Sequence, residues 1–160
     1  MIKSLKHLLL LFAAVALAAC GRETILDQSR ELSDAGWVAT DTLDFQFEVT
    51  DTLAVYDILV DLEHATAYPN QNVYVKVLTE FPNGAKLDQT LSLELANRAG
   101  RWFGDCDAES CDFEVAIQRS AFFNQTGTHR IRVLPYMRRD PVEHVRNFGV
   151  RIEATGERRG

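Results

Sequence analysis

Residues 44–49 read Asp-Phe-Gln-Phe-Glu-Val, a stretch in which polar and apolar side chains alternate one by one. This alternation predicts a β-strand with one buried and one solvated face, because successive side chains of a strand point to opposite sides. The same alternation recurs in six further segments, marked by these apolar residues: Ile58, Val60 and Leu62; Val73, Val75 and Val77; Leu91, Leu93 and Leu95; Phe113, Val115 and Ile117; Ile131 and Val133; Phe148, Val150 and Ile152.

Turn-forming residues separate these segments, and no stretch after residue 35 has sustained helical spacing. The breaks include Tyr68-Pro69-Asn70, residues 81–84 (FPNG) and Gly127-Thr128, where proline, asparagine and glycine favour turns. Strands with one solvated face are typical of antiparallel sheets. We therefore expect an all-β chain of about seven strands folded as an antiparallel β-sandwich, with a β-barrel as the alternative.

The composition is that of a folded globular protein, with 46% hydrophobic and 25% charged residues. It excludes disordered and collagen-like chains. A length of 160 residues allows one domain of moderate size and a short tether. Seventeen Lys and Arg residues against 23 Asp and Glu residues give a net charge of −6. We expect no nucleic-acid partner, because phosphate binding needs a basic face.

The N-terminal residues have the layout of a lipoprotein signal peptide. Lys3 and Lys6 precede the apolar run of residues 8–17 (LLLLFAAVAL), which is too short for the roughly 20 residues of a membrane-spanning helix. Leu17-Ala18-Ala19-Cys20 resembles the bacterial lipobox, whose cysteine is acylated, with palmitate among its lipids, before cleavage. The alternative is an ordinary secretory peptide that happens to contain a cysteine.

These features divide the chain into four parts. We expect a signal peptide over residues 1–19, the lipidated Cys20 with a tether over residues 20–41, the β-sandwich over residues 42–155 and a frayed tail over residues 156–160. Within the tether, a short helix near residues 24–32 is one interpretation of the spacing of its apolar residues.

Short motifs follow the lipobox in a definite order: Gly36-Trp37, residues 45–52 (FQFEVTDT), Tyr56-Asp57-Ile58, Tyr68-Pro69, residues 72–75 (NVYV), residues 81–84 (FPNG), Gly100-Arg101-Trp102, residues 127–131 (GTHRI) and residues 149–153 (GVRIE). In this order they resemble the GldH family of gliding-motility lipoproteins of Bacteroidetes. The resemblance covers about residues 33–155. It implies a non-enzymatic outer-membrane component of gliding motility and the associated type IX secretion, with protein partners in that apparatus and no cofactor.

The residues that follow Cys20 favour the outer membrane. An aspartate in the second position after the lipidated cysteine commonly retains a Gram-negative lipoprotein in the inner membrane, and this chain has Arg22 there. No acidic run follows Cys20, unlike the export tags of some surface lipoproteins. We therefore expect the domain to face the periplasm.

Cys106 and Cys111 are the thiols that remain once Cys20 carries the lipid. They are not part of the family pattern. We expect a disulfide, because the compartment is oxidising and a four-residue gap can be bridged across a tight hairpin. A redox pair is the alternative, although such pairs usually read Cys-x-x-Cys.

No metal or catalytic site is predicted. Asp105, Asp107 and Glu109 alternate as at the start of a calcium loop, but the later ligands are missing, so a solvated acidic loop is favoured. The chain has no nucleophile-elbow, P-loop or zinc-protease motif. The histidines of the mature chain lack metal-ligand spacing, and the first two are expected to be ordinary surface or edge residues: His64, His129 and His144.

Five residues are candidates for contact with a partner: Trp37, Trp102, Phe103, Arg138 and Arg139. Packing within the domain is the other interpretation of the aromatic residues, and it is favoured for Trp37. The two arginines, together with Arg146 and Arg151, either form an electrostatic docking edge for an acidic partner or are simply solvated.

A glycan-binding sandwich of the outer membrane is the alternative function. It requires an exposed aromatic row, for which Trp102, Phe103 and Tyr74 are candidates. Thr42 and Thr52 each lie in an Asp-Thr-Leu triplet that resembles the O-glycan acceptor of exported Bacteroidetes proteins. This three-residue match makes both threonines candidate glycosylation sites.

The lipobox generates a direct prediction. The variant Cys20→Ser removes the acylated thiol, so we expect the domain to fold normally and to leave the membrane fraction. Membrane fractionation and circular dichroism of the released protein measure both properties. A folded Cys20→Ser protein that stays in the membrane fraction would contradict the lipobox assignment.

Overall fold

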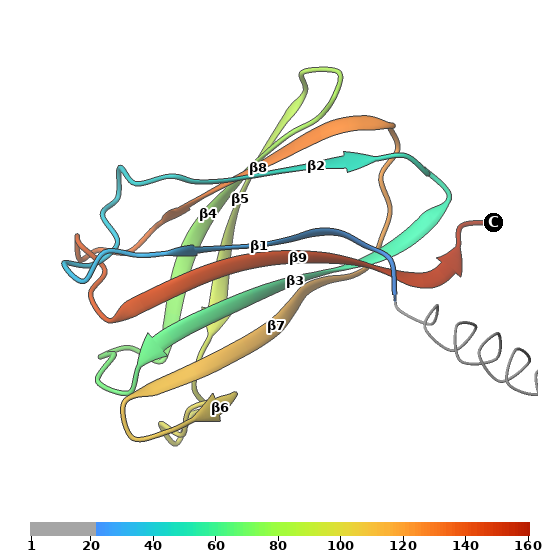
Figure 1. Cartoon of the computed structure of the whole chain (residues 1–160). Coiled ribbons are helices and arrows are strands. Elements are labelled where there is room, and N and C mark those ends of the chain that lie inside the picture. Colours follow the sequence, from blue (N-terminus) through green and yellow to red (C-terminus); the bar gives the residue numbers. More distant parts are fainter. Residues whose placement is uncertain (1–21) are drawn as a thin grey trace, which may run out of the picture.

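The computed structural model describes residues 22–160, which form two layers of antiparallel strands (Figure 1). The strands are β1 (Thr24–Glu31), β2 (Leu43–Val49), β3 (Ala54–Ala65), β4 (Asn72–Glu80), β5 (Lys86–Glu94), β6 (Asp105–Cys106), β7 (Ser110–Ala121), β8 (Gly127–Pro135) and β9 (Val145–Arg158). One sheet has the order β1-β9-β3-β7-β6 and the other the order β2-β8-β4-β5. The predicted antiparallel sandwich is confirmed, and the strands do not close into the alternative barrel.

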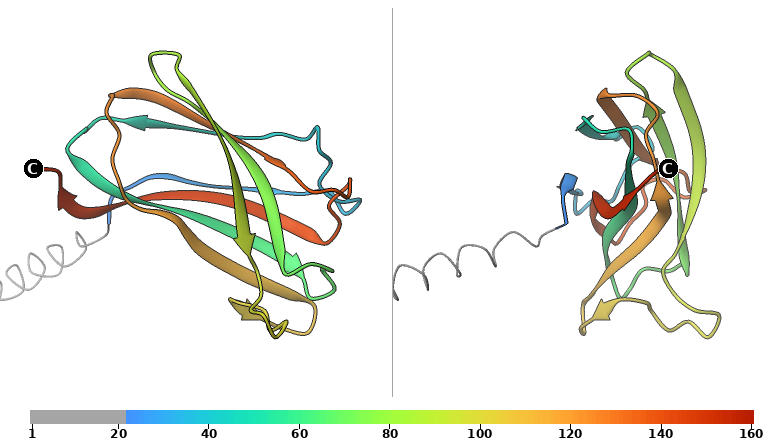
Figure 2. Two further views of the ribbon diagram at one scale, coloured as in Figure 1. Left: turned by 180° about the vertical axis from the view of Figure 1, so that it is seen from behind. Right: turned by 90° about the vertical axis from the view of Figure 1, so that its right-hand side faces the viewer.

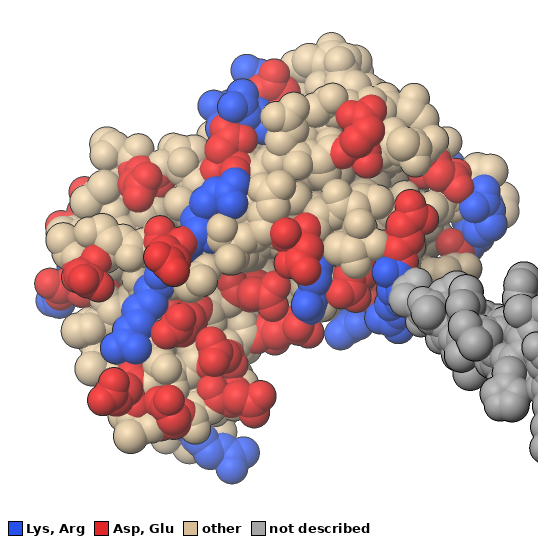
Figure 3. All heavy atoms as spheres, in the orientation of Figure 1, with Lys and Arg blue, Asp and Glu red and all other residues tan. Residues whose placement is uncertain are grey.

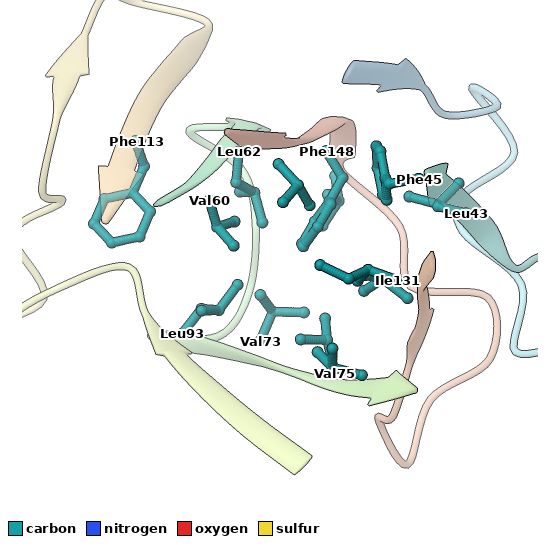
Figure 4. Close-up of a cluster of buried hydrophobic side chains, with 14 of the residues drawn as sticks. Leu43, Phe45, Val60, Leu62, Val73, Val75, Leu93, Phe113, Ile131 and Phe148 are labelled. Carbon is teal, nitrogen blue, oxygen red and sulfur yellow. The ribbon is translucent and has the colours of Figure 1, made fainter. Parts of the chain in front are cut away.

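The space between the two sheets is filled by apolar side chains from both of them (Figure 4). The four-stranded sheet contributes the fully buried Phe45 of β2 and Val73 of β4. The five-stranded sheet contributes the fully buried Phe148 and Ile152 of β9. These residues belong to the alternating segments quoted above. Full burial of each such side chain contributes about 1.5–3 kcal/mol to stability, so the core accounts for the pairing of the two sheets.

β1 differs from the sequence-based expectation, because it is a strand where a tether with a possible short helix is expected. It pairs with β9 in antiparallel register over residues 24–31, and Leu26 is its one fully buried side chain. An edge strand of this kind is held by backbone hydrogen bonds and exposes most of its side chains. Its sequence therefore lacks apolar alternation, and the sandwich begins at Thr24.

The C-terminal strand also extends further than expected. β9 continues to Arg158, whose Nη1 lies 2.8 Å from Oδ2 of Asp51. The backbone N–H of Arg159 donates to the carbonyl oxygen of Leu53 at 2.8 Å. Residues 156–159 are thus held against the chain that enters β3, where a frayed tail is expected.

Cys20 and the expected signal peptide over residues 1–19 lie outside the described residues. Residues 22–160 contain no helix long and apolar enough to cross a membrane.

Gly36 and Trp37 join the connection between β1 and β2 to the loop between β8 and β9. Trp37 exchanges two backbone hydrogen bonds with Val142, at 2.9 and 3.0 Å. Its ring is fully buried 5.4 Å from that of Phe148, and its Nε1–H donates to the carbonyl oxygen of Asp41 at 2.8 Å. Trp37 therefore packs within the domain and has no surface to offer a partner.

A glycine is required beside this tryptophan. Gly36 has a φ of +99°, and a Cβ placed there would lie 2.9 Å from Cβ of Pro141 and 3.1 Å from the carbonyl oxygen of Val142. Both the left-handed backbone and the lack of space disfavour any side chain.

We expect Gly36→Ala to lower the free energy of unfolding by more than the ~1–2 kcal/mol that left-handed backbone costs a residue with a Cβ. Gly84→Ala is the matched control, because Gly84 has a φ of +81° and no atom within 4 Å of an added Cβ. Urea unfolding of both variants separates the steric contribution from the backbone contribution. An equal loss of unfolding free energy in the two variants would show that the close approach to Pro141 adds no cost at Gly36.

Candidate functional site

A groove lies on the outward face of the four-stranded sheet, at the end where the chain enters β4 and leaves β8. The left view of Figure 2 is from behind, with β4 and β5 toward the viewer. The groove has a volume of 810 Å³, within the range of about 300–1,000 Å³ common for ligand sites. We call it the Tyr–Arg groove, lined by Pro69, Asn70, Asn72, Tyr74, Thr90, Tyr136, Met137, Arg138 and Arg139.

Two exposed tyrosines form one part of the Tyr–Arg groove. Tyr74 is 42% exposed and Tyr136 57% exposed, whereas aromatic side chains are mostly buried. The backbone N–H of Tyr136 donates to the carbonyl oxygen of Tyr74 at 2.8 Å, which places the two residues side by side. The ammonium of Lys76 lies 5.2 Å from the centroid of the Tyr136 ring, within the range of a cation–π contact.

The loop that carries Arg138 and Arg139 is anchored at several points. The backbone N–H of Ala39 donates to Oδ1 of Asp140 at 2.9 Å, and Val142 pairs with Trp37. The sulfur of Met137 accepts the backbone N–H of Tyr74 at 3.2 Å. The loop is therefore tied both to the connection after β1 and to β4, so the groove is built from residues far apart in the sequence.

Tyr68 supports the same end of the sheet. Its hydroxyl donates to the carbonyl oxygen of Asn72 at 3.0 Å, and burial raises the pKa of this phenol above its ordinary value. Tyr68 therefore stays a neutral donor and holds the start of β4 in place beside the groove.

The Tyr–Arg groove has a positive lining in an acidic protein. None of its nine lining residues is Asp, Glu, His or Cys. Within residues 22–160, Arg138 has no ion pair, and Arg139 has a single long one, 3.9 Å from Glu143. Guanidinium, amide, hydroxyl and phenol groups of this kind can bind an anion or a sugar, but they lack the paired acid and base that proton-transfer catalysis uses.

Arg146 and Arg151 do not join Arg138 and Arg139 in one basic edge. They lie on the outward face of the five-stranded sheet, where Figure 3 shows acidic side chains interspersed with basic ones. Arg146 pairs with Glu63 at 3.7 Å, and Arg151 pairs with Glu114 and with Glu153. These two arginines are neutralised locally, and the predicted docking edge reduces to Arg138 and Arg139.

Asp61 lies on the same acidic face. Burial raises the pKa of its carboxyl group, and the nearby charge of Arg151 opposes that shift. The described residues contain no group of three or more His, Cys, Asp or Glu side chains placed to hold a metal ion.

In the expected acidic loop, the carboxylate of Asp107 binds backbone N–H groups of the same loop. Oδ1 of Asp107 accepts the N–H groups of Glu109 and Ser110 at 2.7 and 2.8 Å, and these bonds hold its pKa below the ordinary value. The loop ends in a disulfide between Cys106 and Cys111, which joins β6 to β7. The predicted disulfide is confirmed.

Trp102 and Phe103 lie away from the Tyr–Arg groove. The Trp102 ring is half-buried, edge-on to His64 at 4.6 Å, whereas Phe103 is exposed and stacks 6.5 Å from Phe113. They do not line the groove with Tyr74, so the aromatic row considered for glycan binding is not formed by these three residues. The aromatic residue that lines the groove with Tyr74 is Tyr136. One sign of it was present in the sequence, since Tyr136 directly follows a strand and shortly precedes two arginines.

The prediction that His64 and His129 are surface or edge residues is wrong, because they belong to the inner strands β3 and β8. Both are buried, at 0% and 1% exposure. His129 stacks on Phe47 at 5.3 Å. Nδ1 of His64 bonds the carbonyl oxygen of Ala65 at 3.0 Å, while its Nε2 has no partner among the described residues. Burial lowers the pKa of His64, because a charged imidazolium would be poorly solvated there.

Thr42 is exposed and Thr52 is half-buried at a turn. Next to Thr52, Asp51 accepts the backbone N–H of Leu53 at 2.8 Å and pairs with Arg158. O-glycosylation of these two threonines stays a prediction.

A second surface lies along the side where β5 and β7 are the nearest strands of the two sheets. On the opposite side, Arg30 of β1 donates to the carbonyl oxygen of Asp44 in β2 at 3.1 Å and lies over the Phe45 ring, so that side is closed. A cavity of 280 Å³ lies between β5 and β7, and one of 520 Å³ lies further along the same side, where β5 and the end of β7 meet the loops that follow β4 and β7. We call this surface the open side; its apolar lining includes Leu87, Leu91, Val115, Ile117 and Phe122.

Comparison with known proteins assigns the family. The family model described as GldH lipoprotein matches residues 24–152. The chain belongs to the GldH lipoprotein family. The gliding motility lipoprotein GldH of Flavobacterium johnsoniae is 24% identical over 152 residues, which cover 91% of this chain and 94% of the relative. The GldH homolog of Christiangramia forsetii is 19% identical over 150 residues, covering 89% and 91%.

GldH proteins are thus gliding-motility lipoproteins, and the resemblance noted from the sequence motifs is confirmed. Among solved structures, a family 35 carbohydrate-binding module from an environmental isolate matches at a TM-score of 0.33 and 10% identity, covering 86% of this chain and 91% of the module. A likeness at that level carries no argument about function.

The buried His64 predicts a loss of stability in acid. Its pKa is lowered in the folded state, so below about pH 6.5, the ordinary histidine value, the unfolded chain binds more protons than the native one. The contribution of the neutral His64 to the free energy of unfolding is therefore complete above that pH and is lost as the pH falls toward the pKa of His64 in the folded state. Urea unfolding between pH 7.5 and 5 should show a smaller decline for His64→Phe than for the parent chain.

His144→Asn is the control for this measurement, because His144 is exposed and has a φ of 69°, a backbone conformation that asparagine tolerates. This variant removes a histidine from the surface and keeps the buried His64, so its decline in stability is the reference for that of His64→Phe. An unchanged decline in His64→Phe would assign the acid sensitivity to other groups.

Proposed function

We propose that this GldH-family protein is a non-enzymatic, lipid-anchored component of the outer membrane that acts as a protein-interaction module in gliding motility and the associated type IX secretion. In this proposal Cys20 carries the lipid and the sandwich faces the periplasm. Membership of a family of gliding-motility lipoproteins supports the process. The lipobox and Arg22 support the anchor and the membrane.

The open side is the observation that carries the interaction role. Leu87 and Phe122 are 44% and 47% exposed there, beside the half-buried Leu91, Val115 and Ile117. Exposed apolar side chains gathered along one side of a domain mark a surface that a partner covers.

The strand edges at the open side favour a protein as that partner. Among residues 22–160, β5 is the last strand of its sheet, and β7 has the two-residue β6 as its only neighbour on that side, pairing at Cys111 and Asp112. The backbone N–H and C=O groups of β5 and of the central part of β7 that point away from their paired strands are therefore available to an added strand. Main-chain pairing of this kind, with apolar pockets for alternate side chains, is a common way to bind an extended segment of another protein.

The chemistry of the Tyr–Arg groove supports a binding role over a catalytic one. Its lining offers cations, aromatic rings and neutral polar groups, with no histidine, carboxylate or thiol. A hydrolase would need a nucleophile or water held by a general base.

Site-specific photo-crosslinking in gliding cells tests the proposal. A benzophenone amino acid in place of Leu87 or Phe122 should crosslink to a component of the gliding or type IX secretion apparatus, identified by mass spectrometry. The control is the same amino acid in place of Val38, which is 41% exposed in the connection between the closed-side strands β1 and β2.

We expect the crosslinks at Leu87 and Phe122 and none to those components at Val38. Cells that carry Leu87→Asp should spread less than cells with the parent chain while retaining its membrane level, because a buried carboxylate weakens an apolar interface. Normal spreading of Leu87→Asp together with no crosslink at either position would contradict the interaction role of the open side.

A further inference from the structure

We infer that the Tyr–Arg groove is a binding site for a carboxylated carbohydrate chain. The inference is independent of the open side, which the proposed function assigns to protein partners. The groove lies on the outward face of the four-stranded sheet, whereas the open side lies between β5 and β7, so each site can be tested without the other.

Charge is the first argument for an anionic ligand. The whole chain carries 23 acidic against 17 basic residues, yet the groove is lined by two arginines and by no carboxylate. Arg138 makes no hydrogen bond or ion pair with any other residue in the described part of the chain, and Arg139 has only the 3.9 Å pair with the exposed Glu143. Both side chains are therefore available for a ligand. An arginine guanidinium binds a carboxylate through two parallel hydrogen bonds.

Aromatic exposure is the second argument, and it favours a sugar. Tyr74 and Tyr136, which line the groove, are 42% and 57% exposed. Neither ring stacks on another aromatic ring among residues 22–160, and Lys76 lies over one face of Tyr136. Such rings offer an apolar face with a polar hydroxyl at the edge. A pyranose ring matches that pattern, since its C–H face is apolar and its rim carries hydroxyl groups.

Neutral polar groups complete the site. Asn70 and Thr90 line the groove, and their amide and hydroxyl groups can both donate and accept hydrogen bonds. Asn72 donates through Nδ2 to the hydroxyl of Ser92 at 3.0 Å, and this hydrogen bond fixes the orientation of its amide. A few fixed polar groups beside aromatic surface are the usual composition of a small-ligand site.

The strand pairing disfavours an acidic peptide as the ligand. β4 runs along the groove and is paired on both sides, with β5 over residues 72–80 and with β8 over residues 75–80. A peptide in the groove would therefore find no free strand edge of β4 for its backbone and would be held by its side chains alone. A sugar chain needs no such edge, because its hydroxyl and carboxylate groups are its binding groups.

The groove is also held in shape without a ligand. Tyr136 is bonded to Tyr74, Met137 accepts the N–H of Tyr74, and Val142 is paired with the buried Trp37. A preformed site loses less conformational entropy on binding, so measurable affinity is expected for a short oligosaccharide.

Isothermal titration of the full-length lipoprotein in detergent micelles tests the inference. The probe is trigalacturonic acid, and its methyl ester, which has the same rings and no charge, is the matched ligand control. We expect the acid to bind and the ester to bind about tenfold more weakly or worse, because a hydrogen bond to a charged group is worth roughly 1.5–3 kcal/mol and 1.4 kcal/mol is a factor of ten.

Variants locate the binding. Arg138→Ala with Arg139→Ala should weaken trigalacturonate binding about tenfold or more by the same conversion, and Tyr74→Ala or Tyr136→Ala should weaken both the acid and the ester. Arg146→Ala is the matched control, because it removes an exposed arginine on the other sheet. Its affinity should equal that of the parent chain.

Four results would overturn the inference. They are no heat with either trigalacturonate or peptidoglycan fragments at millimolar concentration, equal binding of hexaglutamate, equal binding of inorganic phosphate, and an Arg146→Ala variant as weak as the groove variants. Equal binding of hexaglutamate would make the groove a peptide site, and equal binding of phosphate would make it a general anion site. Circular dichroism of each variant excludes loss of folding as the cause.

A second titration distinguishes the sources of such a ligand. Purified peptidoglycan fragments represent an envelope glycan, and trigalacturonate represents an extracellular acidic polysaccharide. Either one supports the inference if the groove variants abolish its binding, and the tighter of the two indicates where the groove acts. A failure of the crosslinking at Leu87 and Phe122 would leave this result unaffected.

Discussion

The burial of one apolar face of each sheet against the other is the interaction on which the rest of the structure depends. The central strands of each sheet have apolar side chains at every second position, so neither sheet could remain in water alone. Phe45 and Phe148, from opposite sheets, are both fully buried in the resulting core. Because the inner positions are fixed by this pairing, the intervening side chains must face outward. Tyr74 on one sheet and Asp61 on the other are placed in this way, and the Tyr–Arg groove is built on such outward positions. The open side is instead lined by inner positions that the facing sheet leaves uncovered.

The two outward faces have different chemistry. On the five-stranded sheet, acidic residues surround Arg146 and Arg151 and neutralise them. On the four-stranded sheet, Arg138 and Arg139 face a groove without carboxylates. A net charge taken over the whole chain averages these two faces and hides the positive one. The electrostatic field that a ligand meets is set by local arrangement, so an acidic protein can hold a site for an anion.

The same sandwich is closed on one side and open on the other, and this asymmetry has a structural cause. β1 and β2 approach each other across the closed side, where Arg30 bonds to Asp44. No comparable bond joins β5 to β7 within the described residues, and apolar side chains such as Leu87 remain exposed between them. An uncovered strand edge beside apolar side chains is normally protected in a monomeric protein. That reasoning supports a protein partner at the open side and separates it from the ligand chemistry of the groove.

The sequence by itself determined the fold class, the strands of the core, the disulfide between Cys106 and Cys111 and, through motif order, the family. Those features depend on alternation and spacing, which are local properties of the chain. It did not predict β1, whose pairing uses backbone atoms, or the burial of His64, whose neighbours Trp102 and Tyr68 come together only in the folded domain. The Tyr–Arg groove forms only in the tertiary structure. Its residues come from β4, β5 and two loops, and the contact of Trp37 with Val142, across more than one hundred residues of chain, fixes the loop that carries the arginines.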